Sequence, residues 1–233
     1  AGSTASIRSS GVFFHGQTAG ANVNNIIANT STGGIKMVGR STPVTTDTLA
    51  DNVGDGLELT GVAILAKSGA IDLTGTTSAG NTTNRYGFAI DHSTAASLTN
   101  NSASFGARAS TTVAGVDMSS STSNITINCD SLIVGSTSQT HTFLTTGTVT
   151  IQPADGAQSF DRATDLSGLN MGSGVSSLTV GQGGTSGSTQ NTGDVTLSTA
   201  TSIAGPILVY GGDITASANL TSTLLDARIQ LKA

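Results

Sequence analysis

The sequence predicts an all-β protein built as a parallel β-solenoid, and three observations favour this fold. Pairs of apolar residues separated by a single residue recur along the 233-residue chain, and Gly, Ser, Thr and Asn fill most of the segments between them. Residues that favour helices are scarce, since the chain has one Glu and three Lys. No window carries apolar residues at the i, i+3, i+4, i+7 spacing of an amphipathic helix over three turns.

Each apolar pair predicts a short strand with one buried face. Period-two alternation places both apolar residues on one face of the strand and the middle residue, such as Lys36, Glu58 or Thr126, on the other. We therefore expect the middle residues to face water and the apolar residues to form inward ladders. The pairs are Ile35/Met37, Leu57/Leu59, Ile71/Leu73, Val116/Met118, Ile125/Ile127, Val149/Ile151, Leu178/Val180, Val195/Leu197, Ile207/Val209 and Ile229/Leu231.

This parity makes a direct prediction about stability. The side chains expected inside include Ile127, Val149, Leu197 and Ile207. Ile127→Asp should be severe because it buries an unpaired charge, whereas Thr126→Asp on the outer face should cost far less.

The connections between the apolar pairs favour a solenoid over a set of hairpins. Most are polar runs such as residues 183–191, not the two-residue turns that join hairpin strands. In a solenoid, short strands stack on their equivalents one coil away. With about 20–25 residues a coil the chain makes roughly ten coils, and one strand spacing per coil gives a rod about 50 Å long. An up-and-down barrel or a sandwich is the structural alternative.

We interpret residues 1–233 as a single solenoid segment. Residues 76–112 are the least regular part and are expected to be an insertion or a thicker part of the core. The final residues 226–233 form another strand unit, with Ile229 and Leu231 facing inward and no polar cap after them. Because uncovered strand edges template association, we expect the chain to continue beyond Ala233 or its end to meet another subunit. A cover over the last coil by residues 76–112 is the alternative.

Composition argues against several classes of partner. The net charge is −5 with only nine Lys and Arg, which disfavours nucleic acid and anionic membranes. No apolar run approaches the roughly 20 residues that span a bilayer. Cys129 is the only cysteine, so no internal disulfide forms, and the alternation places it on the apolar face as a small buried residue.

The last ninety residues carry an ordered series of short motifs. They include Leu178-Thr179-Val180-Gly181, Gly193-Asp194-Val195-Thr196-Leu197 and Tyr210-Gly211-Gly212-Asp213-Ile214. This series resembles the repeat regions of large filamentous-haemagglutinin-like exoproteins of bacteria, over residues 143–233 and more loosely over 30–75. The resemblance implies a right-handed parallel β-helix, a secreted or cell-surface location and a role in filaments or adhesion. It supplies no catalytic residue.

Few residues suggest a site, and we assign no catalytic, cofactor-binding or metal-binding residue and no cofactor. His15, His92 and His141 lack the spacing of zinc ligands and are expected to face solvent. The glycine-rich run 183–187 lacks the Lys and the helix of a phosphate loop, so we interpret it as a turn.

Two acidic groups are possible exceptions. One combines Asp155, Asp161, Asp165 and Arg162, and the other Asp47, Asp51 and Asp55; we expect solvated loops, with structural Ca²⁺ as the alternative.

The leading hypothesis is therefore a non-catalytic structural or adhesive segment. Its partners would be neighbouring copies or further repeats placed end to end, and surface glycans held by rows of outward Ser, Thr and Asn. The main alternative is a β-helix enzyme acting on polysaccharides through the acidic group around Asp161 and Arg162. We expect Asp161→Asn, Arg162→Ala and Asp165→Asn to change no activity. A minor alternative is ice binding through Thr-x-Thr pairs, which the uneven intervals between pairs disfavour.

Overall fold

The computed structural model of the protein describes residues 11–15, 25–41, 55–77, 86–91, 102–135, 140–154, 159–183 and 193–233. Within these ranges the chain forms 23 strands and no helix. Every strand pair is parallel except one short hairpin. The expected all-β fold with parallel sheets is thus confirmed for the described residues.

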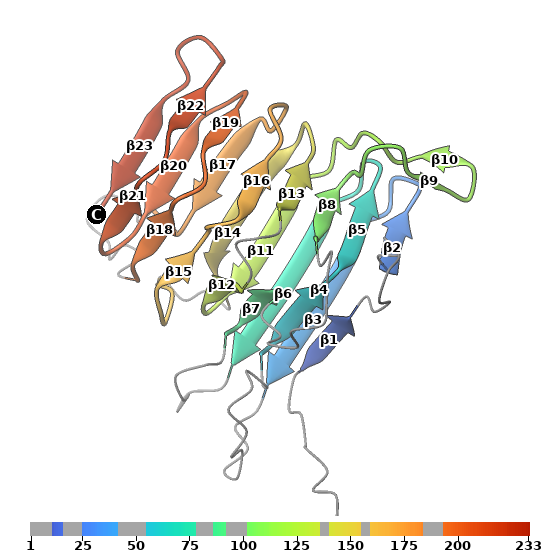
Figure 1. Cartoon of the computed structure of the whole chain (residues 1–233), viewed down its shortest axis with the longest axis horizontal. Helices are drawn as coiled ribbons and strands as arrows, with labels where there is room; N and C mark the ends of the chain where they lie inside the picture. The colour runs from blue at the N-terminus through green and yellow to red at the C-terminus, as the bar shows by residue number, and fades with distance from the viewer. Residues whose placement is uncertain are drawn as a thin grey trace, which may run out of the picture.

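Three parallel sheets, here called A, B and C, receive the strands in turn (Figure 1). Sheet A contains β1 (Val12–His15), β4 (Leu57–Thr60), β7 (Phe88–Ile90) and β12 (Leu132–Val134). Sheet B contains β2 (Asn25–Asn29), β5 (Val62–Ala66), β8 (Ser104–Gly106), β13 (His141–Leu144) and β16 (Leu169–Met171). Sheet C contains β3 (Ile35–Ser41), β6 (Ile71–Thr77), β11 (Ile125–Cys129), β14 (Thr148–Pro153), β17 (Ser177–Val180), β20 (Ile207–Tyr210) and β23 (Ile229–Lys232).

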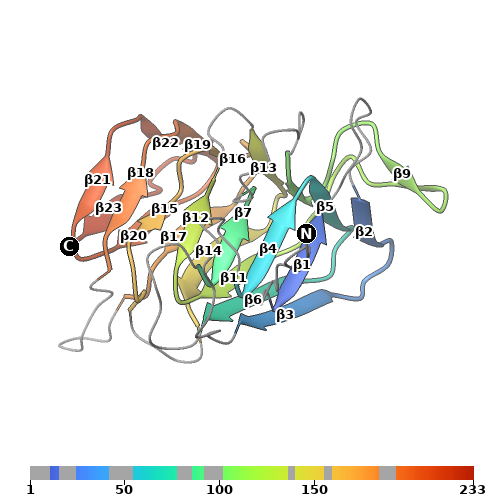
Figure 2. The same ribbon diagram turned by 60° about the horizontal axis from the view of Figure 1, so that its bottom comes forward.

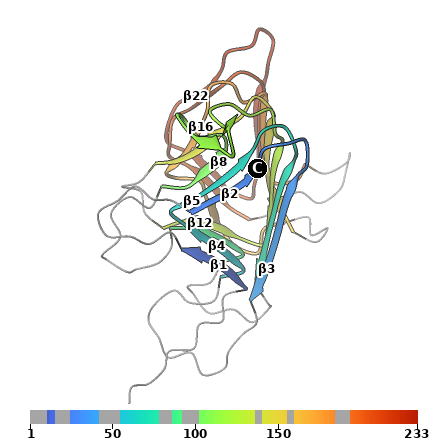
Figure 3. The same cartoon turned by 90° about the vertical axis from the view of Figure 1, so that its right-hand side faces the viewer.

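Two smaller sheets extend sheets A and B toward the carboxyl end. The first contains β15 (Thr164–Asp165), β18 (Val195–Leu197) and β21 (Ile214–Ala216), and β15 lies against β12 of sheet A. The second pairs β19 (Thr201–Ile203) with β22 (Leu220–Ser222), and β19 lies against β16 of sheet B. Viewed from the end formed by β1 to β3, sheet C stands on one side of the interior and the strands of A and B on the other (Figure 3).

The chain passes through A, B and C in the same order each time, and each passage of three strands is called a circuit. Circuits begin at β1, β4, β7, β12, β15, β18 and β21 (Figure 2). The length of a circuit is the sequence distance between aligned residues on successive strands of sheet C. The six distances are 36, 54, 24, 29, 29 and 22 residues, counted along the series Ile35, Ile71, Ile125, Val149, Leu178, Ile207 and Ile229. This arrangement is compatible with a β-solenoid.

The prediction of roughly ten coils of about 20–25 residues was wrong, although the uneven intervals between apolar pairs already indicated coils of different lengths. The described residues form seven circuits, because connections of different lengths separate strands that are themselves short. Hydrogen bonding fixes the spacing between strands at about 4.8 Å whatever the length of the connection. The apolar pairs therefore reveal the strands but not the number of residues between successive circuits.

The core is a set of inward ladders, as the parity predicted. Ile127, Val149 and Ile207 are fully buried and Leu197 is 3% exposed, while Thr126 on the opposite face is only partly buried. Cys129 is also fully buried, which confirms its prediction, and burial raises the pKa of its thiol well above the ordinary value. A protonated, inaccessible thiol is not a nucleophile.

Aromatic residues fill the wider part of the core. Phe105 of β8 and Phe143 of β13 are aligned partners in sheet B, and their rings stack with centroids 4.6 Å apart. Phe88 of β7 is fully buried beside Leu57 and Leu132, its partners in sheet A. The described parts of residues 76–112 thus contribute β7 and β8 to the third circuit, and lie away from the last circuit.

A hairpin adds a second layer outside sheet B. It pairs β9 (Thr112–Val113) with β10 (Val116–Asp117), so the prediction that Val116 and Met118 form a solenoid strand was wrong. Alternation alone does not distinguish a solenoid strand from a hairpin strand, since a hairpin strand also buries one face. Ala114 and Gly115, at φ of 49° and 81°, form the tight turn. Met118 packs on the outer face of sheet B against Ala63 and Leu65.

The outer face of the sheets is not uniformly solvated. Glu58, expected to face water, is 3% exposed, and Ala89 beside it in sheet A is fully buried. Strand periodicity states which face a side chain occupies, but not whether a further layer covers that face. The hairpin over sheet B shows how such a layer arises.

Candidate functional site

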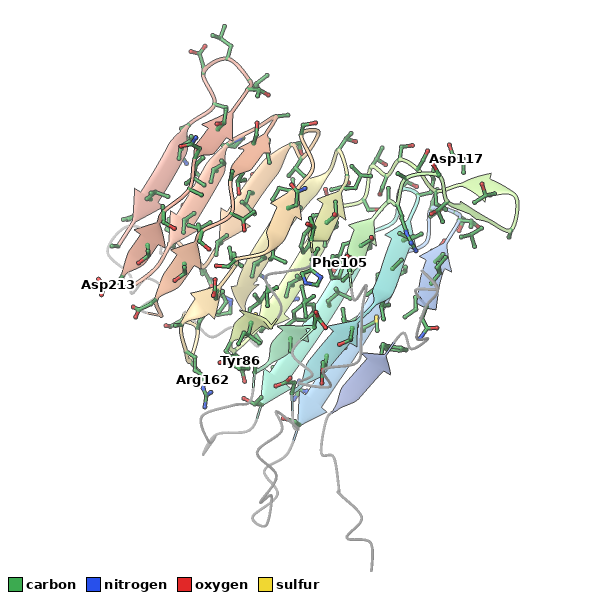
Figure 4. All side chains as sticks on the ribbon, in the orientation of Figure 1. Tyr86, Phe105, Asp117, Arg162 and Asp213 are labelled. Carbon is green, nitrogen blue, oxygen red and sulfur yellow. The ribbon has the colours of Figure 1, made fainter. Side chains whose placement is uncertain are left out.

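Chemically active side chains gather at the corner where the chain leaves sheet C and enters sheet A. Asp130 follows β11, Tyr86 precedes β7, and Asp161 and Arg162 precede β15. These segments are distant in sequence, but parallel strands bring their connections to the same edge. Figure 4 shows Tyr86 and Arg162 together at this corner, which we call the C-to-A corner.

Asp130 ties three of these connections together. Its Oδ2 accepts hydrogen bonds from the Thr77 backbone N–H at 2.6 Å and from the Thr77 hydroxyl at 2.8 Å. Its Oδ1 accepts a bond from the Ser131 hydroxyl at 3.2 Å, and its backbone carbonyl accepts one from the Asp161 N–H at 2.7 Å. These bonds occupy the carboxylate with the backbone and hydroxyls of the fold, which is a structural role.

Asp161 is the perturbed carboxyl of the corner. Partial desolvation, followed by repulsion from Asp130, raises its pKa above the ordinary value, and attraction to Arg162 only partly opposes this. The Arg162 guanidinium in turn lies over the Tyr86 ring, 5.8 Å from the centroid. A carboxyl group and a tyrosine hydroxyl can transfer protons, whereas the guanidinium stays charged and only donates hydrogen bonds.

Asp55 supports the corner from inside the protein. It is fully buried, and its Oδ1 accepts a hydrogen bond from the Tyr86 N–H at 2.7 Å. The expectation of a solvated turn was therefore wrong for Asp55, because the carboxylate replaces water as the acceptor for a backbone donor. Asp47 and Asp51 lie outside the described residues.

The predicted acidic group of Asp155, Asp161, Asp165 and Arg162 does not assemble as a unit among its described members. Asp165, in β15, accepts hydrogen bonds from the N–H and hydroxyl of Ser167, whose hydroxyl also bonds that of Ser198. Asp161 and Arg162 belong to the C-to-A corner, and Asp155 lies outside the described residues. In the described part of the chain no three His, Cys, Asp or Glu side chains are grouped so that they could hold a metal ion.

His141 was expected to face solvent, and this was wrong. The side chain is fully buried on the inward face of β13, the same face as Phe143 two residues later. Its Nδ1 accepts a hydrogen bond from the Ala103 N–H at 3.1 Å. An internal backbone donor therefore makes burial of the imidazole tolerable. His92 and the side chain of His15 lie outside the described residues.

Sheet C carries a short threonine row on its outer face. Thr126, Thr150 and Thr179 are aligned on three successive strands, although their sequence intervals are uneven. The row has Asp72 on one side and Leu208 on the other. Irregular intervals thus do not prevent alignment, but charge and bulk limit the array to three strands.

The glycine-rich run after β17 enters the described structure only at its start. Gly183 lies against the Tyr210 ring, where a Cβ atom would come within 2.7 Å of ring carbons. Close packing is therefore sufficient reason for this glycine. Residues 184–192 lie outside the described residues.

Comparison with known proteins does not assign the chain to a family: no family model, no curated protein and no solved structure matches it. No helix among the described residues is long and apolar enough to cross a membrane. The fold and the corner therefore carry the functional argument.

Sequence reasoning missed Asp130 and Tyr86 as members of the corner. A signal for Asp130 existed, because it directly follows the strand that ends at Cys129, and residues after parallel strands meet at one edge. The partners of that edge depend on the alignment of strands 30 or more residues apart. Local sequence does not encode that alignment.

Proposed function

We propose that this chain is a non-catalytic structural and adhesive segment of a secreted bacterial surface or filament protein. One observation carries the proposal: strands stack in register through seven circuits, and the described first and last circuits have edges that pair with no other described strand. Such a stack extends by adding further strands at either end. The repeat motifs of residues 143–233 support the bacterial and secreted parts of the proposal.

The proposal includes a closed, right-handed β-helix. Each return from one strand to the next parallel strand of the same sheet is a crossover connection, and such connections are right-handed in about 98% of cases. The outward row of Thr126, Thr150 and Thr179 supports weak multivalent contact with glycans.

Growth along the stack tests the proposal. We expect the purified chain to form rods that lengthen with protein concentration, with strands about 4.8 Å apart along the rod. Sedimentation over a concentration series and electron microscopy measure this growth. A chain that stays monomeric at every concentration contradicts the proposal.

Polysaccharide cleavage is the second candidate function, favoured by the Asp161, Arg162 and Tyr86 grouping. Asp161→Asn removes the candidate catalytic carboxyl, so it would abolish cleavage by an enzyme and leave a structural function intact. The same variant also tests the raised pKa of Asp161. Because folding raises the pKa of Asp161, its ionised form destabilises the folded state at neutral pH; this penalty shrinks as pH falls through the raised pKa and is gone below the ordinary pKa of the carboxyl. Asp161→Asn should therefore stabilise the protein at pH 7 by at most about 0.5 kcal/mol, with the gain vanishing in acid.

Urea unfolding at several pH values measures that gain, and Asp165→Asn is the matched control. On the same samples, release of sugar ends from acidic polysaccharides measures cleavage, for which we expect none. Cleavage by the wild type that Asp161→Asn or Arg162→Ala abolishes would establish the enzyme instead.

A further inference from the structure

The most exposed large apolar side chains occur only in the first and last circuits of the described structure. The first circuit exposes Ile26 and Val38, each at 44%. The last circuit exposes four residues, Leu224 at 62%, Leu225 at 87%, Ile229 at 43% and Leu231 at 46%. Ile229 and Leu231 have the inward parity of their strand, so their exposure arises because no described strand lies beyond β23. Apolar exposure limited to the ends marks them as contact surfaces.

The two ends carry complementary features at the same corner of the stack. Leu224 and Leu225 lie in the connection from β22 to β23, which runs from the sheet B side to sheet C. The hairpin lies in the connection from β8 to β11, which also runs from sheet B to sheet C. Both features stand along the upper edge of Figure 1, at opposite ends of the molecule.

The hairpin shapes an apolar patch beside the first circuit. Val113, Val116 and Ala28 of β2 are partly buried. They pack against the small apolar cluster of Ala63, Leu65 and Met118. Ile26 lies on the same outer face of β2, two residues before Ala28. We call Ile26, Ala28, Val113 and Val116 the hairpin patch. Lys67 holds the hairpin in place by donating hydrogen bonds to the Asp117 carbonyl and the Ser120 hydroxyl, at 2.8 and 3.1 Å.

The strand edges of sheet C are compatible with the same joint. β23 pairs only with β20, and β3 pairs only with β6, among described strands. Continuing the register of sheet C places Ile229 opposite Ile35 of a second copy, and Leu231 opposite Met37. Gln230 then faces Lys36, so this pair of sheet C brings no like charges opposite each other.

We propose that the Leu224–Leu225 loop of one copy binds the hairpin patch of the next copy, joining copies head to tail. When the strands of two copies align, the last circuit of one copy stacks on the first circuit of the next copy. The connections from sheet B to sheet C of the two copies then lie together, which brings the loop to the hairpin patch. A heterologous contact that does not close into a ring produces an open filament. This inference rests on the proposed structural function and specifies its joint.

Cysteine pairing between two variants tests the joint. The native Cys129 is fully buried, so a single introduced thiol is the reactive one. Leu225→Cys in the loop and Thr112→Cys in the hairpin are made separately, mixed and oxidised gently. We expect the mixed disulfide to form at least tenfold more than with Asn170→Cys, an exposed control in the middle of the stack. Mass spectrometry of the cross-linked peptides identifies the pair.

Assembly of uncharged and charged variants gives a second readout. Leu225→Asp should weaken rod growth at least tenfold, while Asn170→Asp and Leu225→Met should leave it near the wild-type level. Rods that grow without the mixed disulfide and without sensitivity to Leu225→Asp would overturn the joint and leave the structural function standing. A dominant Leu225→Cys homodimer would indicate tail-to-tail pairing and also overturn it. Failure of the wild type to assemble at all would overturn the joint and the proposed function together.

Discussion

Ile127→Asp is expected to destabilise the protein by more than about 4 kcal/mol, a large part of the 5–15 kcal/mol that stabilises a typical domain. Ile127 is fully buried in β11, an inner strand of sheet C, between Leu73 and Ile151 on the neighbouring strands. A carboxylate there has only apolar neighbours within its ladder, so its desolvation is uncompensated. Urea unfolding monitored by circular dichroism measures the loss, or shows directly that the variant does not fold.

The control for this variant lies on the outer face of the same sheet. Thr126→Asp places the new carboxylate on the opposite, outer face of the same strand. There it lies beside Asp72, the aligned residue of the neighbouring strand. Thr150→Asp avoids that repulsion, because Thr150 lies between Thr126 and Thr179. Its expected cost is about 1 kcal/mol, mainly the poor strand propensity of Asp. Similar losses for Ile127→Asp and Thr150→Asp would show that the assigned faces are wrong.

Phe143→Ala is expected to cost about 3–5 kcal/mol, because it removes a ring from the fully buried part of the core and leaves a cavity. Phe105→Ala removes the other ring of the stack and should cost a similar amount. The rings are stacked at an interplanar angle of 18°, so the two losses should not be additive. A double-mutant cycle by urea unfolding should give a coupling of about 1 kcal/mol.

Phe143→Leu separates the volume of the ring from its stacking. Leu retains most of the apolar volume, so this variant should lose about 1.5 kcal/mol or less beyond the stacking contribution. The coupling with Phe105 should fall when Leu replaces Phe143. Additive losses in the Phe105→Ala and Phe143→Ala cycle would mean that the two rings do not support each other in the folded protein.

The faces of single strands are predictable from sequence for a local reason. Strand parity is a property of two or three neighbouring residues, so alternation was sufficient to place Ile127, Val149 and Cys129 inside. His141 follows the same rule, because it shares the parity of the buried Phe143. Its polarity suggested solvent, but the Ala103 N–H supplies a partner inside the core. Polarity is therefore a weaker guide than parity when a backbone donor is near.

The sequence by itself determined that this protein is all-β, which residues of most strands alternate into its core, and that the strand at 229–232 has one apolar face. Tertiary structure alone decided how the strands align, where the hairpin lies, and that Asp130, Asp161, Arg162 and Tyr86 share one corner. The physical reason is that alternation is encoded by adjacent residues. Alignment instead depends on hydrogen bonds between strands separated by connections of variable length, with circuits from 22 to 54 residues long.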